Sequence, residues 1–434
     1  MKAQFSSPSR LAGSLRVPAS KSYTHRALIV AALLAGGRVH HPLKAEDTDA
    51  TREAITALGV KISDTGTGFD IETSDQPQLT ADRINTGESG TLLRFLTPIC
   101  SVIPGPEEVV LEAEGTLLSR SHEELVRTLR DNGFKIEATG SHATAPLTCF
   151  PGQQLPETPL KLTAQTTSQH LSGWLIALAF SGGGDIELAG KPVSAPYLEM
   201  TARLLRRAGV SVKTPEPNHY RVVPNQLKPL DYEVPGDYSS AAFHIIGSLL
   251  TEGKLELQGL VPDDPQADRQ IISLLANLGA PVAWQGSSSK SSLEVRGPFR
   301  PPNFHYDAGA CPDLVPVLAV FAAFASGEEV VLENIAHLKN KESDRLAATC
   351  TELNKTAATA RASADKLIIK PPSGNFSEEK IVFNTYDDHR IAMAFSIFAL
   401  VRGNCELTGV ECVNKSYPNF YDHLSSLGVN FDLL

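Results

Sequence analysis

The chain has 434 residues and a formal net charge of −10. This length is enough for two or three domains with real cores, and the acidic balance argues against nucleic acid or an anionic membrane as the main partner. Apolar residues make up 42% of the chain and charged residues 20%, as in ordinary globular proteins. Any local cluster of Lys and Arg is therefore informative, because the average surface repels anions.

The N-terminal sequence has no apolar stretch of the kind found in signal peptides. The longest apolar run, 315–325, is too short to span a bilayer. The cysteines are scattered and form neither a C-x-x-C pair nor a His/Cys cluster at zinc spacing. We therefore expect a cytoplasmic protein with reduced thiols and no bound metal.

In chain order, one pattern recurs six times: an apolar helix, a glycine and an alternating strand. The glycines are Gly37, Gly105, Gly184, Gly253, Gly327 and Gly403. They are separated by 68, 79, 69, 74 and 76 residues, and such spacing indicates a repeat architecture. Glycine directly after a helix is typical of the left-handed residue that ends it, so we expect these six to be helix stops.

A second helix follows in each repeat and again ends at a small residue before a strand. These residues are Gly59, Gly133, Gly209, Gly279, Ala357 and Gly428. The first helices are almost entirely apolar and should be buried, whereas the second are amphipathic and should face solvent. Each repeat is therefore predicted to be a β-α-β-α-β module, and the fold class is α/β.

Every apolar helix begins with a polar cluster 13 to 15 residues before its glycine. The clusters centre on Ser22, Gly90, Gln169, Ser239, Asp313 and Arg390. A helix N-terminus presents free N–H groups and partial positive charge, which suits an anion. Plain N-capping is the alternative for the Ser and Asp members. Capping does not explain Lys21, Arg26 or Arg390, because a cation opposes the helix dipole there. These three predict an anionic ligand.

Further candidates lie outside those clusters. Lys341 and Arg345 are four residues apart, so on a helix they share a face and could hold one phosphate or carboxylate. Glu342 in the same run is a sensible cap near a helix start, and as a lone residue Asp313 is also a cap. Arg120 and Lys415 lie in loops, where most cations are simply solvated.

Several common motifs are missing from the sequence. No phosphate-binding G-x-x-x-x-G-K-[ST], no G-x-G-x-x-G after a strand and no G-x-S-x-G is present. His389 could ligate a metal, but no second His or Cys stands at a useful spacing. A nucleotide cradle, a hydrolase nucleophile and a metal centre are therefore not predicted.

Taken together, the segments resemble the 5-enolpyruvylshikimate-3-phosphate synthase family along the whole chain. The matching segments are PASKS at 18–22 with Arg26, SGT at 89–91 with Arg94, SQ at 168–169, VSAPY at 193–197, GDYSS at 236–240, PD at 312–313, KESDR at 341–345, DHR at 388–390 and Lys415. The KESDR and DHR segments in this order are the most specific of these.

The resemblance implies a two-domain inside-out α/β barrel of six β-α-β-α-β-β repeats, three per domain, with buried parallel helices. One domain would be residues 18–234, on the shikimate 3-phosphate side, and the other residues 1–17 with 235–434. The active site would lie in the cleft between them. No coiled coil or interface strip is evident in the sequence, so we expect a monomer.

The reaction implied is transfer of the enolpyruvyl group of phosphoenolpyruvate to the 5-hydroxyl of shikimate 3-phosphate, with release of phosphate. It proceeds by addition and elimination through a tetrahedral ketal, needs no cofactor, and serves the shikimate pathway to chorismate and aromatic amino acids. The two substrates bring two phosphates and two carboxylates, which suits a site rich in cations. An acid and a base are also required.

The resemblance also assigns residues. Phosphoenolpyruvate would be bound by Lys21, Gly90, Arg120, Gln169, Arg345, Arg390 and Lys415. Shikimate 3-phosphate would be bound by Lys21, Ser22, Arg26, Thr167, Ser168, Gln169, Ser194, Tyr197, Asp313, His337 and Lys341. Asp313 would take the hydroxyl proton, Glu342 would be the proton donor or its partner, and Lys21 would contact both substrates as a third catalytic residue.

Four positions depart from the common pattern of the family. Glu88 and His337 each stand in place of an Asn, Thr167 replaces a Ser, and Phe95 replaces a Pro. Glu88 lies beside the expected phosphate of phosphoenolpyruvate, so these changes bear on affinity for that substrate and on the response to glyphosate. We expect the activity to be retained.

Three other readings compete. A UDP-N-acetylglucosamine enolpyruvyl transferase would carry Lys-Asn where this chain has Lys21-Ser22, and a Cys in the loop at 117–122, which has none. An RNA cyclase of related repeats would need a nucleotide site and a covalent His, and neither is evident in the sequence. A non-catalytic anion-binding protein is consistent with the cations, but the presence of both Asp313 and Glu342 argues against it, and turnover would distinguish the two.

Overall fold

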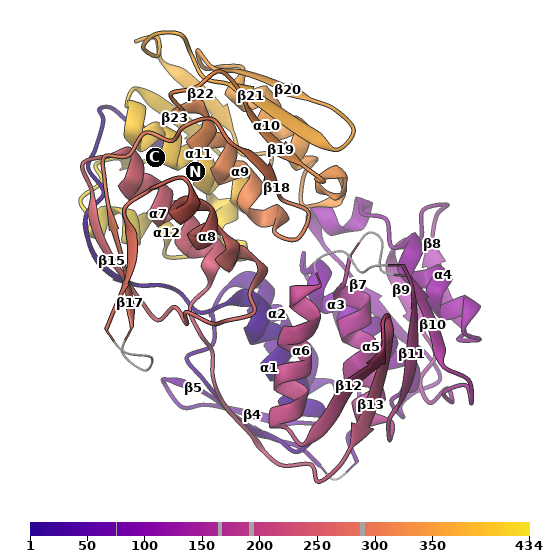
Figure 1. The fold of residues 1–434 in the computed structure, drawn as a ribbon. Coiled ribbons are helices and arrows are strands. Elements are labelled where there is room, and N and C mark those ends of the chain that lie inside the picture. The colour runs from indigo at the N-terminus through magenta and orange to yellow at the C-terminus, as the bar shows by residue number, and fades with distance from the viewer. Residues whose placement is uncertain (75, 164–166, 191–194, 287–290) are drawn as a thin grey trace. The chain divides into compact units, whose positions relative to one another are not determined.

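The computed structural model describes residues 1–74, 76–163, 167–190, 195–286 and 291–434. The chain forms two compact units, one of Met1–Pro18 with Pro235–Leu434 and the other of Ala19–Val234 (Figure 1). The chain therefore passes between the units twice, at Pro18–Ala19 and at Val234–Pro235. We refer to these as the terminal unit and the middle unit.

The middle unit holds three four-stranded sheets. Their orders are β14 (Leu230–Glu233), β3 (Gly37–His40), β5 (Gly68–Glu72), β4 (Lys61–Asp64); β6 (Arg83–Asn85), β7 (Val109–Glu112), β9 (Thr144–Cys149), β8 (Ile136–Thr139); and β10 (Leu160–Thr163), β11 (Gly184–Ala189), β13 (His219–Pro224), β12 (Val210–Glu216). The first helices of its repeats are α1 (Lys21–Leu33), α3 (Gly90–Val102) and α5 (Gln169–Phe180). The second helices are α2 (Glu46–Thr56), α4 (Glu123–Asp131) and α6 (Pro196–Arg207).

The terminal unit has the same plan. Its sheets are β2 (Gly13–Arg16), β15 (Lys254–Gln258), β17 (Ser292–Arg296), β16 (Val282–Gln285); β18 (His305–Asp307), β19 (Val330–Glu333), β21 (Lys366–Lys370), β20 (Thr359–Ala362); and β22 (Ile381–Asn384), β23 (Cys405–Thr408), β1 (Lys2–Phe5), β24 (Asp432–Leu433). The first helices are α7 (Tyr238–Leu250), α9 (Val315–Ala323) and α11 (His389–Arg402). The second are α8 (Gln270–Asn277), α10 (Arg345–Leu353) and α12 (Phe420–Ser426).

All six sheets share one pattern of pairing. An edge strand runs parallel to the strand that follows the buried helix, as β10 does with β11, and the other two strands are antiparallel, as β13 is to both β11 and β12. In four of the sheets that edge strand is the one that precedes the helix in sequence. Short 3₁₀ helices complete the loops: η1 (Gly115–Ser119), η2 (Ala267–Arg269), η3 (Pro312–Leu314), η4 (Ala336–Asn340) and η5 (Val410–Lys415). The predicted α/β fold class with six repeats, three in each unit, is confirmed.

The first helix of each repeat is buried, as its unbroken apolar character predicts. All of α9 is buried, as is α11 from His389 to Leu400. In the terminal unit α11 packs against α7 and α9, while each of these helices also contacts strands of its own sheet (Figure 1). The helices thus form the core and the sheets lie outside them, which is the inside-out arrangement.

Two strands are exchanged where the chain passes between the units. β2 precedes α1 in sequence but pairs in parallel with β15, in the sheet of the fourth repeat. β14 precedes α7 but pairs in parallel with β3, in the sheet of the first repeat. The N-terminal strand β1 similarly completes the sixth sheet, between β23 and β24. Each unit therefore closes its sheets with strands distant in the sequence.

The six repeat glycines have a different role from the one predicted. Only Gly403 is a helix cap with positive φ, at +74° on α11. The helix-stop prediction is wrong for Gly37 and Gly184, which begin β3 and β11. It is also wrong for Gly105, Gly253 and Gly327, because none of the three has a positive φ.

Close approach of another segment explains the glycine at these sites. A Cβ on Gly105 would lie 2.6 Å from Cβ of Leu79, and one on Gly327 would lie 2.6 Å from Cβ of Asn303. Gly253 faces the backbone carbonyl of Leu11 in the same way. The glycine thus makes room for the segment that leads into the neighbouring parallel strand of the same sheet. Glycine is needed there for close approach and not for its backbone angle.

Among the described residues, every helix is either too short or too polar to cross a bilayer.

Candidate active site

The polar residues of the terminal unit gather at the N-termini of α9, α10 and α11. Asp313 lies in η3, directly before α9, with Pro312 at the first position of that turn. The loop between η4 and α10 supplies Lys341 and Glu342, and Arg345 is the first residue of α10. Arg390 lies in the first turn of α11.

Arg345 organises this cluster. Its side chain is 1% exposed and donates hydrogen bonds to three carboxylates. Nη1 bonds Asp313 Oδ1 at 2.7 Å, Nη2 bonds Glu342 Oε2 at 2.6 Å and Nε bonds Asp388 Oδ2 at 2.8 Å. Burial acts to lower the pKa of Arg345, but these carboxylates outweigh it and raise that pKa. A buried cation paired in this way is rigidly oriented.

Asp313 is surrounded by cations. Besides Arg345, it accepts a hydrogen bond from Arg390 Nη2 at 3.3 Å, and Lys341 Nζ lies 3.9 Å from Oδ1. Burial alone would raise the pKa of Asp313, but Arg390, Lys341 and Arg345 together hold it well below its usual range. The carboxylate is therefore ionised at neutral pH.

Part of the Arg390 guanidinium has no acceptor among the described residues. Arg390 is 3% exposed, and the atoms concerned are Nε and Nη1. Burial acts to lower its pKa, but Asp313 and Asp237 outweigh this and raise it. Buried N–H groups without acceptors are costly unless a ligand supplies one, and a ligand carboxylate would fit both.

Lys415 and His337 lie beside this cluster. Lys415 Nζ donates to the backbone carbonyl of Asp387 at 3.0 Å and to its Oδ2 at 2.7 Å. His337 is in η4, and burial, aided by Lys341, lowers its pKa to about 4. Its Nε2 has no partner among the described atoms, so a neutral imidazole with one unsatisfied nitrogen stands near Asp313.

The middle unit carries a second set of polar residues, again at helix starts. Lys21 is the first residue of α1, and its Nζ bonds Asp47 Oδ2 at 2.8 Å. Arg26, one turn later, is 1% exposed and donates to the neutral oxygens of Thr201, Ser22 and Ser172. Burial lowers the pKa of Arg26 to about 10, so it is still a cation at neutral pH.

The start of α3 is crowded by two guanidinium groups. A Cβ on Gly90 would lie 2.9 Å from Arg94 Nη1 and 3.4 Å from Arg120 Nη1. Arg94 Nη1 donates to Gln169 Oε1 at 2.7 Å, and Gln169 Nε2 donates to Thr91 Oγ1 at 2.8 Å. Gly90, Arg120 and Gln169, all of which the resemblance assigned to phosphoenolpyruvate binding, therefore lie around one helix N-terminus.

Glu88 fixes the loop that carries Arg120. Its Oε2 accepts hydrogen bonds from both N and Oγ1 of Thr116, each at 2.9 Å, and Arg120 Nη2 donates to Thr116 Oγ1 at 2.7 Å. Gly115 sits directly against the Glu88 carboxylate, at φ +50°. The Glu88 carboxylate is thus linked through the Thr116 hydroxyl to Arg120, a cation of the predicted phosphate site.

The remaining predicted residues of the middle unit are partly described. Thr167 Oγ1 accepts a hydrogen bond from Gln169 N at 3.2 Å, and Ser168 precedes α5 as its N-cap residue. Tyr197 lies in the first turn of α6, with its ring 5.8 Å from the Arg26 guanidinium carbon. Ser22 is in the first turn of α1, and Ser194 lies outside the described residues.

Sequence reasoning missed several partners of the predicted residues. Asp47 pairs with Lys21, and Asp388, for which N-capping was one interpretation, both caps α11 and binds Arg345. Asp268 is fully buried against Ser239 Oγ, and burial together with Asp313 raises its pKa to about 7. Short-range patterns give no signal for such pairs. The acidic start of α2 was the one visible hint, since it contains Asp47.

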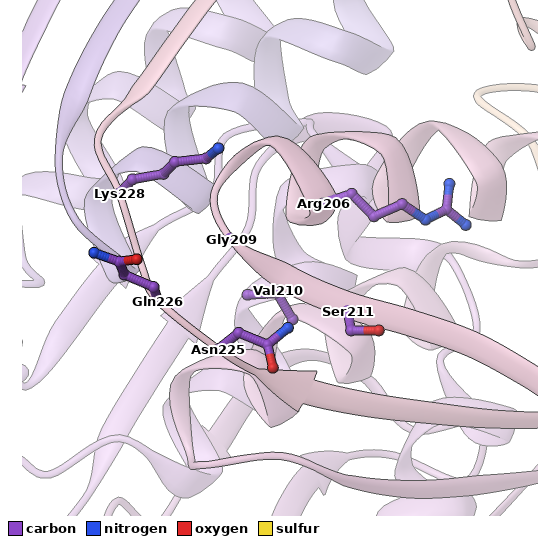
Figure 2. Close-up of a pocket in the computed structure, with 7 residues that line it drawn as sticks. All are labelled: Arg206, Gly209, Val210, Ser211, Asn225, Gln226 and Lys228. Carbon is purple, nitrogen blue, oxygen red and sulfur yellow. The ribbon is translucent and has the colours of Figure 1, made fainter.

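A pocket lies beside the end of α6 in the middle unit. Its volume is about 490 Å³, and it is lined by Arg206, Gly209, Val210, Ser211, Asn225, Gln226 and Lys228. Figure 2 shows the Arg206 side chain extending away from Lys228, and Arg206 pairs with Glu199 at 3.0 Å. The pocket contains none of the predicted site residues. Within the described residues, no group of three or more His, Cys, Asp or Glu is placed to hold a metal ion.

The fold of the chain is that of solved enolpyruvyl transferases. The enolpyruvyl transferase NikO from Streptomyces tendae has the same fold, with a TM-score of 0.75 at 17% identity over 99% of this chain and 98% of that one. An EPSP synthase from Acinetobacter baumannii superposes with a TM-score of 0.80 at 26% identity, over 99% of both chains.

The sequence comparisons identify the family. A family model described as EPSP synthase (3-phosphoshikimate 1-carboxyvinyltransferase) matches residues 5–424. The 3-phosphoshikimate 1-carboxyvinyltransferase of Methanococcoides burtonii is 34% identical over 423 residues, covering 96% of each chain. The chain belongs to the EPSP synthase family. The resemblance stated from the motifs is confirmed, and with it the enzyme class and the shikimate pathway reaction.

Proposed function

We propose that the two sets of polar residues serve one reaction, in which the 5-hydroxyl of shikimate 3-phosphate adds to C2 of phosphoenolpyruvate and phosphate then leaves. The observation that carries this proposal is Asp313, an ionised carboxylate between Arg345 and Arg390. Arg390 also has two buried donors awaiting an acceptor. A base thus lies beside a cation that can bind an anion, and the reaction requires both.

The residue roles follow the sequence assignment. Phosphoenolpyruvate is bound by Lys21, Gly90, Arg120, Gln169, Arg345, Arg390 and Lys415. Shikimate 3-phosphate is bound by Lys21, Ser22, Arg26, Thr167, Ser168, Gln169, Ser194, Tyr197, Asp313, His337 and Lys341. The grouping of Gly90, Arg94, Arg120 and Gln169 at one helix start supports the phosphate part of this assignment.

In the addition step, Asp313 takes the proton of the substrate hydroxyl as the O–C2 bond forms. Glu342 or Lys21 supplies a proton to C3, which gives the tetrahedral ketal. In the elimination step the C2–O bond to phosphate breaks, a proton leaves C3, and the enolpyruvyl ether and inorganic phosphate are formed. The proton taken from the hydroxyl balances the one carried away by phosphate.

Ligand binding also tunes the base. With three cations around it, Asp313 alone is a weak proton acceptor, because its pKa is held far below neutral. A substrate carboxylate or phosphate shares Arg390, Lys341 and Arg345 and so weakens their hold on Asp313. The pKa of Asp313 therefore rises when the substrates are bound, at the moment when its basicity is needed.

The two sets lie in different units, since Asp313 belongs to the terminal unit and Gly90 to the middle unit. We propose that these units are the two family domains, that the substrates bind in the cleft between them, and that one monomer carries the whole site. A cytoplasmic location suits the six free cysteines.

The test is release of phosphate from phosphoenolpyruvate by the purified protein, with and without shikimate 3-phosphate. We expect release only when both are present, and a loss of roughly 10²- to 10⁴-fold in kcat for Asp313→Asn. Asn keeps the size of the side chain and a hydrogen-bond acceptor for Arg345, so the fold should persist, as checked by circular dichroism.

Two controls sharpen the result. UDP-N-acetylglucosamine in place of shikimate 3-phosphate should give no release. Tight binding of shikimate 3-phosphate with no phosphate release from folded protein would show a binding protein instead, and a fully active Asp313→Asn variant would remove Asp313 from its role as the base.

A further inference from the structure

Glu352 is a carboxylate sealed inside the terminal unit. It lies in the last turn of α10, the helix that begins with Arg345, and it is 0% exposed. Its Oε1 accepts a hydrogen bond from Tyr386 Oη at 2.6 Å. Its Oε2 accepts from the backbone N of Asn384 at 3.1 Å and pairs with Lys355 Nζ at 2.6 Å. Two of these partners belong to one loop.

That loop, Asn384–Asp388, joins β22 to α11 and contains an unfavourable backbone conformation. Tyr386 and Asp387 both have φ +54°, so two successive residues with side chains are left-handed. Such a conformation is disfavoured outside glycine and persists only where surrounding contacts impose it. Asn384 Oδ1 accepts from Tyr386 N at 2.9 Å, and Glu352 holds both ends of this turn.

The loop in turn positions the polar residues of the candidate site. The carbonyl and carboxylate of Asp387 hold Lys415. The carboxylate of Asp388 accepts from Arg345 Nε at 2.8 Å and from Arg390 N at 2.9 Å. Small shifts of this loop would therefore move three cations at once.

Burial, together with the adjacent Glu352 carboxylate, raises the pKa of Tyr386 to about 12. The phenol thus stays protonated at neutral pH and remains a donor to Glu352. The contact is a charge-assisted hydrogen bond to a fully buried carboxylate, which is among the stronger kinds.

We propose that Glu352 is a positioning residue for the reaction, which holds the left-handed Tyr386–Asp387 turn and through it sets Lys415 and Arg390 for the anionic enolpyruvyl donor. The inference rests on the proposed function for the roles of Lys415 and Arg390. A simpler alternative is that Glu352 only stabilises α10 through its ion pair with Lys355, three residues along the helix.

Three single variants separate these explanations. Glu352→Gln cannot accept from both partners, Tyr386→Phe removes the phenol donor, and Lys355→Met removes only the ion pair. KM for each substrate and kcat are measured for all three, with thermal unfolding to check the fold. We expect KM for phosphoenolpyruvate to rise roughly 10- to 100-fold in Glu352→Gln and less in Tyr386→Phe. KM for shikimate 3-phosphate should change less than about twofold, and Lys355→Met should resemble the wild type.

A double variant tests the role of the backbone. Glu352→Ala removes the side chain that holds the turn. Adding Tyr386→Gly lowers the conformational free energy of the left-handed backbone at that position. We expect the double variant to recover part of the affinity for phosphoenolpyruvate that Glu352→Ala loses. A structural role in α10 alone predicts no recovery.

The outcomes are distinct. If Lys355→Met matches Glu352→Gln, if both substrates lose affinity equally, or if Tyr386→Gly worsens Glu352→Ala, the positioning role is wrong. If the wild-type protein releases no phosphate at all, it is the proposed function that fails, and the Glu352 variants then have no activity to change.

Discussion

At the scale of single residues, the chemistry of the site depends on which carboxylate lies next to which cation. Glu88 is one such carboxylate. It binds Thr116 through two hydrogen bonds, and Thr116 in turn accepts one from Arg120. The carboxylate therefore has two opposite effects: it orders the loop of Arg120, and it places a negative charge near the proposed phosphate site.

Glu88→Gln separates these two effects. Gln keeps an acceptor for Thr116 and nearly the same shape over Gly115, but it removes the charge. We expect KM for phosphoenolpyruvate to fall about 2- to 10-fold, because a like charge beside a bound phosphate is repulsive even when partly screened. Initial rates at saturating shikimate 3-phosphate measure this effect.

Two companion variants serve as controls. Glu88→Ala loses the loop contacts as well as the charge and should raise KM. Glu114→Gln removes a carboxylate from the same loop, one that bonds Asn85 at 2.6 Å, and should change nothing. A rise in KM for Glu88→Gln would mean that the charge itself holds Arg120.

Sequence reasoning located the cations of the site but not their partners. Lys21, Arg26 and Arg390 stood out because a cation at a helix start opposes the dipole. Arg345 stood out because it lies four residues after Lys341. That Arg345 would bind Asp388, 43 residues away, could not be read from local spacing. Capping was the alternative given for the Asp members of the helix-start clusters, and Asp388 does cap α11 through Arg390 N. Its second contact depends on how α10 and α11 pack.

At the scale of elements, the buried helices were predictable and their contacts were not. An almost unbroken apolar run must be buried, and α9 and α11 are. Strand exchange was outside the reach of periodicity, because β2 and β14 look like ordinary strands before α1 and α7. Only the resemblance to the family indicated where the chain changes units. Pairing of strands more than 200 residues apart is a tertiary property.

The contact between α3 and α5 depends on a single glycine. A Cβ on Gly173 would lie 2.8 Å from Pro98 Cγ and 3.0 Å from both Arg94 O and Phe95 Cα. These are mostly backbone and ring atoms, which cannot move aside. We expect Gly173→Ala to lower the free energy of unfolding by about 1–3 kcal/mol, although Ala favours helix by about 1 kcal/mol.

Gly247 in α7 is the matched control. A Cβ there would meet Leu11 Cδ1 at 2.9 Å and Ile397 Cδ1 at 3.3 Å, which are ends of flexible side chains. Gly247→Ala should therefore stay within about 1 kcal/mol of the wild type. Urea unfolding of both variants provides the comparison, and equal losses would show that helix contact at Gly173 is not the determining factor.

At the scale of the whole molecule, the proposed reaction needs both units, yet the chain joins them by only two connections. The connections leave the terminal unit together, since Asp237 N donates to Pro18 O at 2.9 Å and Val17 N to Gln258 O at 2.9 Å. Two adjacent linkers form a natural hinge, because a few residues there can absorb a rotation while both cores stay intact.

We expect binding of shikimate 3-phosphate to draw the units together, because its phosphate is attracted to cations such as Arg26 in one unit and Lys341 in the other. Small-angle scattering should show the radius of gyration falling on its addition, toward the roughly 22 Å of a compact chain of this length. Shikimate without its phosphate should produce a smaller change, since most of the charge is lost. Asp313→Asn should still close, because it keeps all the cations. An unchanged radius with bound shikimate 3-phosphate, confirmed by calorimetry, would mean that closure does not wait for this substrate, and the second substrate would then have to supply the attraction.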